Sequence, residues 1–527
     1  MKNFNFLKSG RIKEVCFIAF LLIISLFFHF FYKNFADNDS FFYIREAWRL
    51  RTEGIFTTDF PWTYFSMIRE YGISLWWGFL IILQPFTYFS DLRIGIKMAG
   101  VIFTFLGLLI FYLTIRREKV IWPFIWPLFY LFSAPNILYR FLMVRPQIIS
   151  TALSFLLLSV LARGSIYTVI ITSFLITWIH FNFFFVPIVI YAVYFLAKLA
   201  VEKKADFWKG AGVIVGVVLG WVARPDFWLA GKLVYIQIVD LFLTKQAKIP
   251  LLFGAENEPL LWITLLRNFW PTILIFIFGV FVLAKFYFEK YKKGEIFKAG
   301  DGEEIFTLAS FILASGFLFL TMFSARRAYD FWVGFSMLFL ASISTYLLPK
   351  ISFKTRELLE SVFKYGIIVL FIFSLFYSIY KNDRSMKEEA FRPDRLEEAS
   401  LWLRENSKEK DIVFNLNWAR FSQMFFWNQK NYYIGGLDPI FQYIYNEDLY
   451  WKFHYLSTDL VTKKTCGKEE CKVEDLEDTY EVLKNDFKAK FVFLEKEQNP
   501  AVYWYLEQDE RYEKKFENKK EVIFEVK

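Results

Sequence analysis

The sequence predicts a polytopic α-helical membrane protein with a C-terminal α/β domain. Of its 527 residues, 56% are hydrophobic and 22% aromatic, and its mean hydropathy is +0.33. Apolar runs recur from residue 14 to residue 380, several near the roughly 20 residues that a helix needs to cross a bilayer. The last 146 residues hold 54 of the Asp, Glu, Lys and Arg side chains. We therefore expect a membrane domain over 1–381 and a soluble domain over 382–527, and we exclude a disordered chain or an ordinary soluble enzyme.

The apolar runs and the basic loops together predict eleven spans. The N-terminal basic residues precede an apolar stretch without a cleavage signal, so the first run is a retained span. Loops rich in Lys and Arg usually lie on the cytoplasmic side of a membrane. All such loops of this chain can lie there only if the run 73–90 does not cross the membrane. That run is then a re-entrant or interfacial helix, and its Trp76-Trp77 pair, Gln84 and Pro85 suit an interfacial position. The spans are then 15–32, 94–115, 120–138, 147–162, 165–180, 181–200, 208–224, 259–284, 303–323, 328–348 and 361–380.

This topology places the N-terminus inside and the C-terminal domain outside. The net charge of +9 comes mostly from the short basic loops, so the expected partner is the lipid bilayer and not nucleic acid. The ionisable residues that interrupt apolar sequence gather on the outer side. Because a charge at mid-membrane costs roughly 2.5–3.5 kcal/mol, such residues usually line a cavity or meet a partner. The sequence therefore predicts a polar site at the outer membrane surface.

An acidic segment, Asp37-Asn38-Asp39-Ser40-Phe41-Phe42-Tyr43, comes directly after the first span. Two carboxylates at this spacing can hold a divalent cation such as Mg or Mn, or one can act as a general base. Asp39 can equally be the N-cap of the amphipathic helix that follows. Asp59 lies further along the same outward loop. The segment is a candidate catalytic or metal site.

This segment, with the juxtamembrane helix and aromatic-rich spans that follow it, resembles the GT-C superfamily of membrane glycosyltransferases and the first loop of oligosaccharyltransferase catalytic subunits. The resemblance implies a GT-C-like fold in a bacterial or archaeal cell membrane and catalysis by Asp39 with Asp37 as its companion. It also implies a polyprenyl-phosphate-linked sugar donor, a glycan, lipid or protein acceptor, and inversion at the sugar. The outward segment 139–147 carries no carboxylate, and the tail has no Trp-Trp-Asp-Tyr-Gly motif. Oligosaccharyltransferase-like protein glycosylation is therefore the second candidate.

Arginines at the outer ends of predicted spans are candidates for binding the lipid phosphate. Arginine offers a planar fork of donors to phosphate oxygens, although at a helix end it can also snorkel to headgroups. Asp330 is placed to orient one guanidinium. Weaker candidates for the acceptor are His180, Asp59 and Asp438. The resemblance to GT-C enzymes also implies that the loop from Asp226 to Glu258 closes over the site. The phosphate-binding candidates are Arg145, Arg224, Arg326 and Arg327.

The tail alternates helix and strand patterns. It predicts helices near 394–406, 419–427, 446–455, 476–486 and 499–507, and strands at 411–416, 431–434, 490–494 and 522–526. Asp438 follows Gly435-Gly436 in a turn, and the charged run 507–521 is interpreted as a solvated face. Cys466 and Cys471 lie five residues apart on the outer side, where a local disulfide is expected.

Two other classes of function compete with a glycosyltransferase. In a transporter or lipid flippase, Asp39 and the arginines would line a translocation path. Transporter sequences typically show internal repeats and charges near mid-membrane. Here no repeat is evident and the charges gather at one face. A receptor or assembly factor that binds a partner through its tail would leave Asp39 dispensable.

Overall fold

The computed structural model describes residues 10–295, 300–351, 353–388, 390–459 and 462–527, and the chain divides into two compact units. The helical unit comprises Met1–Asp37, Ile96–Ala223 and Ala255–Ala390. The mixed unit comprises Asn38–Gly95, Arg224–Gly254 and Phe391–Lys527. Each unit thus joins segments that are far apart in the sequence. The predicted domain boundary near residue 381 stays a prediction.

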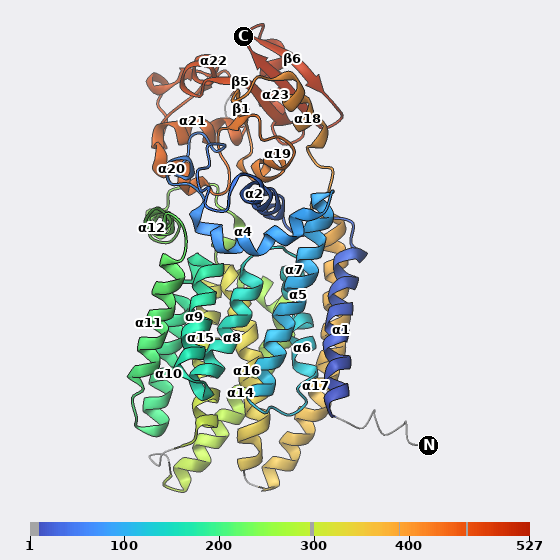
Figure 1. Ribbon diagram of the computed structural model, residues 1–527, viewed down its shortest axis with the longest axis vertical. Helices are drawn as coiled ribbons and strands as arrows, with labels where there is room; N and C mark the ends of the chain where they lie inside the picture. Colours follow the sequence, from blue (N-terminus) through green and yellow to red (C-terminus); the bar gives the residue numbers. More distant parts are fainter. Residues whose placement is uncertain (1–9, 296–299, 352, 389, 460–461) are drawn as a thin grey trace. The chain divides into compact units, whose positions relative to one another are not determined.

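The helical unit is a bundle of mostly long, apolar helices (Figure 1). The long helix α5 starts in the mixed unit and continues into this one. The helices are α1 (Gly10–Phe31), α5 (Leu92–Arg117), α6 (Ile125–Phe132), α7 (Pro135–Phe141), α8 (Gln147–Arg163), α9 (Ile166–Ile179), α10 (Val186–Glu202), α11 (Phe207–Val222), α14 (Trp262–Lys292), α15 (Gly302–Phe323), α16 (Tyr329–Ser342) and α17 (Phe353–Glu388).

Eight helical stretches in the described residues are long and apolar enough to cross a membrane. Three predicted spans correspond to the shorter apolar helices α8, α9 and α11. The predicted span 120–138 is instead divided into α6 and α7, because the helix ends at the residues before Pro135. The stretch Phe227–Gln246 was predicted as an outward loop, but it is long and apolar enough to cross a membrane. The number of crossings therefore stays a prediction.

The run 73–90 forms no helix long enough to cross a bilayer. It is broken into η2 (Ser74–Trp76), α4 (Trp77–Leu83) and η3 (Gln84–Tyr88). Pro85 lacks the N–H that a continuing helix needs, which explains the change to a 3-10 helix after Leu83. Its interfacial position stays a prediction.

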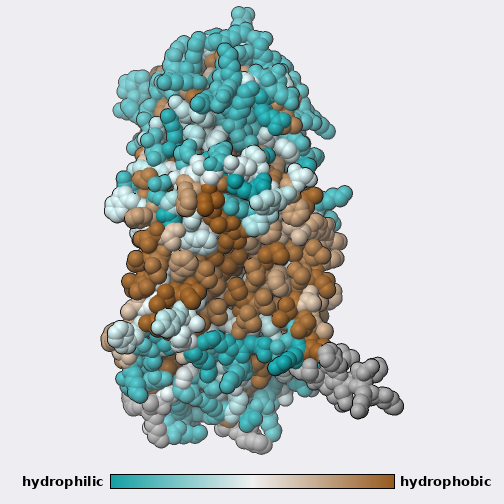
Figure 2. Space-filling model, in the orientation of Figure 1, coloured by the Kyte–Doolittle hydropathy of each residue, from teal (hydrophilic) through white to brown (hydrophobic). Residues whose placement is uncertain are grey.

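The surface of the helical unit is apolar over the middle of its helices. Figure 2 shows brown, hydrophobic side chains in a band over these helices and teal, hydrophilic ones over their lower ends. Large apolar side chains of this unit, such as Phe27, Val218 and Phe373, are exposed. Exposed apolar area on this scale is typical of a surface that faces lipid.

Small residues let two of these helices approach closely. Gly212, Gly216 and Gly220 lie four residues apart on one face of α11 and pack against α9. A Cβ atom at Gly216 would come within 2.5 Å of the carbonyl oxygen of Ile170. This spacing of small residues brings membrane helices into backbone contact.

The mixed unit is built around a five-stranded sheet with the order β2-β1-β5-β7-β6. β1 is parallel to β2 and β5, whereas β7 is antiparallel to β5 and β6. The segment after α2 (Asp39–Glu53) joins this sheet, because the backbone N–H of Tyr64 donates to the carbonyl oxygen of Tyr433 and Phe65 enters the core. The strands are β1 (Ile412–Asn415), β2 (Tyr432–Tyr433), β5 (Ala489–Glu495), β6 (Tyr512–Glu517) and β7 (Glu521–Val526).

The helices of this unit come from the three stretches of chain that form it. The run 507–521, predicted as a solvated face, contains β6, an edge strand whose charged side chains are mostly exposed. The sequence pattern also did not indicate α20 (Pro439–Tyr445) or the two-stranded antiparallel sheet of β3 (Lys464–Thr465) and β4 (Glu477–Asp478). The helices are α2 (Asp39–Glu53), α3 (Met67–Tyr71), α12 (Phe227–Tyr235), α13 (Leu241–Gln246), α18 (Glu397–Asn406), α19 (Phe421–Trp427), α20 (Pro439–Tyr445), α21 (Glu447–Ser457), α22 (Thr479–Glu481) and α23 (Pro500–Gln508).

Candidate functional site

Charged side chains from several helix ends meet in the helical unit. Asp37 follows α1, and Arg140 lies in the last turn of α7. Arg145 lies in the loop before α8, and Glu256 lies in the 3-10 helix η6 (Ala255–Asn257) before α14. The 3-10 helix η7 (Arg326–Ala328) and the first turn of α16 supply the remaining members. This arginine–carboxylate cluster comprises Asp37, Arg140, Arg145, Glu256, Arg327 and Asp330.

Arg145 links two carboxylates in this cluster. Its Nε and Nη2 atoms donate to Oδ1 of Asp37 at 2.9 and 2.7 Å, and its Nη1 atom donates to Oε1 of Glu256 at 2.7 Å. The side chain of Asp37 is only 1% exposed. A carboxylate so poorly solvated needs a close counter-charge, and the guanidinium supplies it through two hydrogen bonds.

Two further guanidinium groups surround the carboxylate of Glu256. Nη2 of Arg140 lies 2.9 Å from Oε2 of Glu256, and Nε of Arg140 lies 3.4 Å from Oδ2 of Asp330. Nη2 of Arg327 lies 4.0 Å from Oε1 of Glu256. The Glu256 carboxylate is therefore held by arginines from three different segments.

The Glu256 carboxylate is the anion around which the arginines of the cluster gather. Burial would raise the pKa of Glu256, but the positive charges of Arg145 and then Arg140 and Arg327 outweigh it and hold that pKa well below its ordinary value. Three arginines face three carboxylates, so the formal net charge of the cluster is zero. Without Glu256 it would be +1. Arginine donors of this kind suit carboxylate and phosphate oxygens alike.

Two other predicted residues of this unit have different partners. The backbone N–H of Arg326 donates to the carbonyl oxygen of Glu258 at 2.7 Å, and its Nη2 atom lies 3.8 Å from that carboxylate. His180, at the end of α9, lies with Nδ1 3.1 Å from Oγ of Ser150. Arg326 therefore ties η7 to the loop that carries Glu256, and His180 has a hydrogen-bond partner outside the cluster.

The mixed unit contains the predicted residues Asp39 and Arg224. Asp39 is the first residue of α2, and Asn38 precedes it at the N-cap position. Arg224 is 3% exposed, and its Nη1 atom donates to the carbonyl oxygens of Ser74 and Leu75 at 3.0 and 3.2 Å. Burial lowers the pKa of Arg224 to about 9. These contacts fasten η2 to the chain before α12.

The remaining predicted residues of the mixed unit are Asp59, Asp438 and the two cysteines. The side chain of Asp59 is exposed. Asp438 is the N-cap of α20 and accepts a hydrogen bond from the N–H of Ile440 at 3.2 Å. Cys466 and Cys471 form a disulfide. None of these residues belongs to the arginine–carboxylate cluster.

The sequence reasoning missed two members of the cluster. Arg140 was placed in an outward segment without a role, and Glu256 was expected only as part of a closing loop. The signal for Arg140 was its spacing from Arg145 on one short outward segment. No local signal marks Glu256 as the partner of both arginines, because their contact joins residues more than 100 positions apart.

The carboxylate of this unit that was predicted to hold a metal does not fit that role. Oδ1 of Asp37 already accepts two hydrogen bonds from Arg145, whose positive charge would repel a divalent cation. Within the described ranges, no three His, Cys, Asp or Glu side chains lie together as a metal site. We therefore derive no step through Mg or Mn.

Comparisons with known proteins agree on the fold. No family model matches the sequence, and no curated protein matches it. Among solved structures, the archaeal oligosaccharyltransferase AglB from Archaeoglobus fulgidus, in complex with an inhibitory peptide and a dolichol-phosphate, is 13% identical. The match covers 96% of this chain and 73% of AglB, with a TM-score of 0.58.

A second neighbour is ArnT from Cupriavidus metallidurans bound to undecaprenyl phosphate. It is 11% identical, with 98% of each chain covered and a TM-score of 0.54. A third is an Archaeoglobus fulgidus oligosaccharyltransferase in complex with Zn and sulfate, at 11% identity, 94% and 71% coverage and a TM-score of 0.55. These proteins are GT-C glycosyltransferases. The chain described here has a GT-C-like fold, a mostly helical membrane architecture with a C-terminal domain that contains a sheet.

Proposed function

We propose that the protein is an integral membrane glycosyltransferase that moves a sugar from a polyprenyl-phosphate-linked donor to an acceptor at the outer membrane surface. Its GT-C-like fold supports this function, as do its apolar helices. Neighbours of the same fold bind dolichol-phosphate and undecaprenyl phosphate. The soluble domain over 382–527 would lie on the same outer side as the reaction.

The observation that carries the proposal is the meeting of Arg140, Arg145 and Arg327 around Glu256. The lipid phosphate of the donor would replace the Glu256 carboxylate and accept hydrogen bonds from the same donors. The cluster without Glu256 has a formal charge of +1, which suits a phosphate group. Asp37 acts as a positioning residue, because its two hydrogen bonds fix the orientation of Arg145.

The reaction would be one displacement at the anomeric carbon of the sugar. The acceptor oxygen or nitrogen forms the new bond, and the bond between the anomeric carbon and the phosphate oxygen breaks. The electron pair leaves with the phosphate, whose growing negative charge the arginines stabilise. Asp39 accepts the acceptor proton as general base. Attack from the face opposite the leaving group inverts the configuration.

The acceptor class separates two versions of this function. A glycan or lipid acceptor is the leading version. A protein acceptor, as in an oligosaccharyltransferase, is the second, because AglB shares the fold. The missing Trp-Trp-Asp-Tyr-Gly motif in the tail favours the first version.

The test is sugar transfer by purified protein from radiolabelled polyprenyl-phosphate and polyprenyl-pyrophosphate donors to lipid, glycan and peptide acceptors. Loss of the general base in Asp39→Asn should lower kcat about 100- to 10,000-fold. Loss of one phosphate donor in Arg145→Gln should lower kcat/KM about 100- to 1,000-fold. A parallel assay with EDTA tests for a divalent cation.

Matched controls are Asp383→Asn and Arg384→Gln, two residues at the end of α17 that pair within their own helix. Both should keep the wild-type rate. Full activity in Asp39→Asn would remove the general base from the mechanism. No transfer from any donor by a folded protein that still binds the lipid would favour the transporter.

A further inference from the structure

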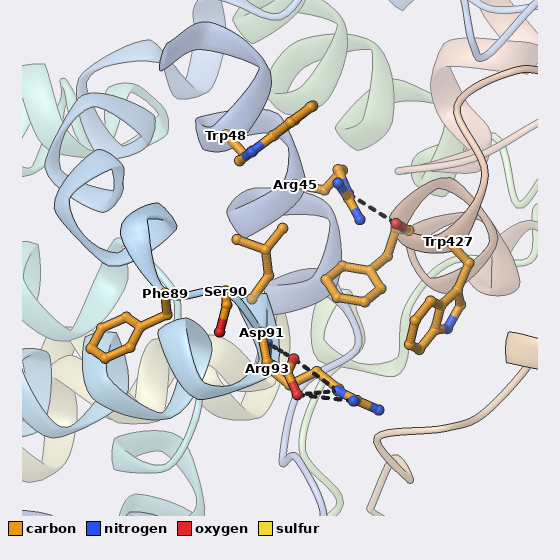
Figure 3. A pocket seen from close by; sticks show the side chains of 9 residues that line it. Arg45, Trp48, Phe89, Ser90, Asp91, Arg93 and Trp427 are labelled. Atoms are coloured by element: carbon orange, nitrogen blue, oxygen red, sulfur yellow. Dashed lines mark hydrogen bonds and ion pairs between the residues drawn. The ribbon is translucent and has the colours of Figure 1, made fainter. Parts of the chain in front are cut away.

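A pocket in the mixed unit has a chemistry distinct from that of the arginine–carboxylate cluster. It has a volume of about 450 Å³ and lies between α2, the junction of η3 and α5, and the end of α19 (Figure 3). Aromatic and cationic side chains dominate its walls. The lining residues are Arg45, Trp48, Phe89, Ser90, Asp91, Leu92, Arg93, Phe426 and Trp427.

Arg45 brings an uncompensated positive charge to this pocket. Its Nε atom donates to the carbonyl oxygen of Phe426 at 2.9 Å, and its guanidinium lies 5.2 Å from the Trp48 ring and 5.0 Å from the Phe426 ring. No described Asp or Glu forms an ion pair with it. Burial and the charge of Arg404 lower the pKa of Arg45 to about 10, so Arg45 stays cationic at neutral pH. A guanidinium held this way gains free energy from an anion.

Arg93 on the opposite wall is already paired. Its Nε and Nη2 atoms each lie 2.9 Å from an oxygen of Asp91, and its guanidinium lies over the Trp427 ring. Figure 3 shows this pair below the space that Arg45 faces. The pocket lining therefore has a formal charge of +1, which comes from Arg45. One negative charge would neutralise it.

The position of the pocket indicates where that anion comes from. Leu92 and Arg93 begin α5, which is long and apolar enough to cross the membrane. Beside them, Tyr88 and Phe89 are 74% and 39% exposed, and Ile94 is 44% exposed. Exposed aromatic residues at the start of a span are typical of the lipid headgroup region. The pocket therefore opens where phosphate-bearing headgroups are concentrated.

We propose that this pocket binds the phosphodiester headgroup of an anionic membrane lipid, with Arg45 donating to the phosphate and the acyl chains lying along α5. The aromatic walls pack against the glycerol part of the headgroup. The site goes beyond the proposed sugar transfer, because none of its residues belongs to the arginine–carboxylate cluster. It is expected to be occupied whether or not a sugar donor is present.

The test is native mass spectrometry of the full chain released from detergent with dioleoyl phosphatidylglycerol or dioleoyl phosphatidylcholine. Wild-type protein should retain phosphatidylglycerol in preference to phosphatidylcholine. Arg45→Gln should weaken phosphatidylglycerol binding about tenfold, the loss of a hydrogen bond to a charged group. The control is Arg51→Gln on the same helix, whose guanidinium lies over Tyr88 outside the pocket. It should bind as the wild type does.

Thermal unfolding separates lost binding from lost folding. Without added lipid, Arg45→Gln should unfold in one transition close to the wild-type temperature, because removing the uncompensated charge and losing the hydrogen bond to Phe426 act in opposite directions. Added phosphatidylglycerol should raise the unfolding temperature of the wild type and not that of the variant. Equal binding by Arg45→Gln, or an equal loss in Arg51→Gln, would overturn the proposal. Displacement of the lipid by millimolar inorganic phosphate would overturn the lipid as the source of the anion.

Discussion

At the residue scale, Glu256 is the side chain whose replacement should distinguish a phosphate site from a purely structural ion cluster. Glu256→Gln removes the internal anion while keeping its size. We expect it to bind polyprenyl phosphate about tenfold more tightly, because the ligand no longer competes with a carboxylate. The measurement is a binding titration with undecaprenyl phosphate. A weaker affinity would mean that Glu256 helps to bind the ligand and does not occupy its place.

The same residue has a predictable effect on stability against pH. The folded pKa of Glu256 is lowered, so its ionised form stabilises the folded state above the ordinary pKa of 4.5. As the pH falls below 4.5, the unfolded chain takes up the proton first, and this stabilisation is lost towards the lower folded pKa.

We therefore expect Glu256→Gln to lower the unfolding temperature at pH 7, and this difference from wild type to shrink only below about pH 4.5. The measurement is thermal unfolding in detergent over a pH series without lipid. Glu388→Gln, at the exposed end of α17, serves as the control and should follow the wild type throughout. If the difference in unfolding temperature between Glu256→Gln and wild type grew as the pH fell, the lowered pKa of Glu256 would be contradicted.

At the scale of elements, the approach of α9 and α11 depends on small residues. Gly216→Leu would force a side chain against the backbone of Ile170 and should destabilise the fold by about 1–3 kcal/mol, as overpacking does. The matched control is Gly316→Leu on α15, where an added Cβ meets nothing within 4 Å. Thermal unfolding of the two variants compares them directly. An equal loss in both would show that close packing of α9 against α11 is not the cause, because replacing Gly by Leu raises helix propensity at either position.

At the scale of the whole molecule, the topology can be tested with two single cysteines. In a Cys16→Ala background, Lys204→Cys lies after α10 in a predicted cytoplasmic loop, and Lys519→Cys lies between β6 and β7. A membrane-impermeant maleimide should label Lys519→Cys in intact cells and Lys204→Cys only after permeabilisation. No labelling of Lys519→Cys in intact cells would contradict an outward C-terminal domain, and labelling of Lys204→Cys there would contradict a cytoplasmic loop after α10.

The class of fold was predictable because its signals are local. Apolar runs of span length identify membrane helices wherever they occur, and the alternating patterns of the tail indicated β1, β2, β5 and β7 at close to their observed positions. The resemblance carried by Asp37 to Tyr43 led to the GT-C-like fold that the solved neighbours share. The edge strand β6 was missed because its exposed charges hide the strand pattern.

Tertiary structure decided which charges meet. The sequence by itself determined that Arg145, Arg327 and Asp330 lie at helix ends, since each follows or precedes an apolar run. It did not determine that Arg140 and Arg145 both bind Glu256, or that Arg326 instead binds Glu258. Such pairings depend on how helices distant in the chain pack together. Charged side chains pair with whichever counter-charge the packing brings within reach, and local sequence does not record that distance.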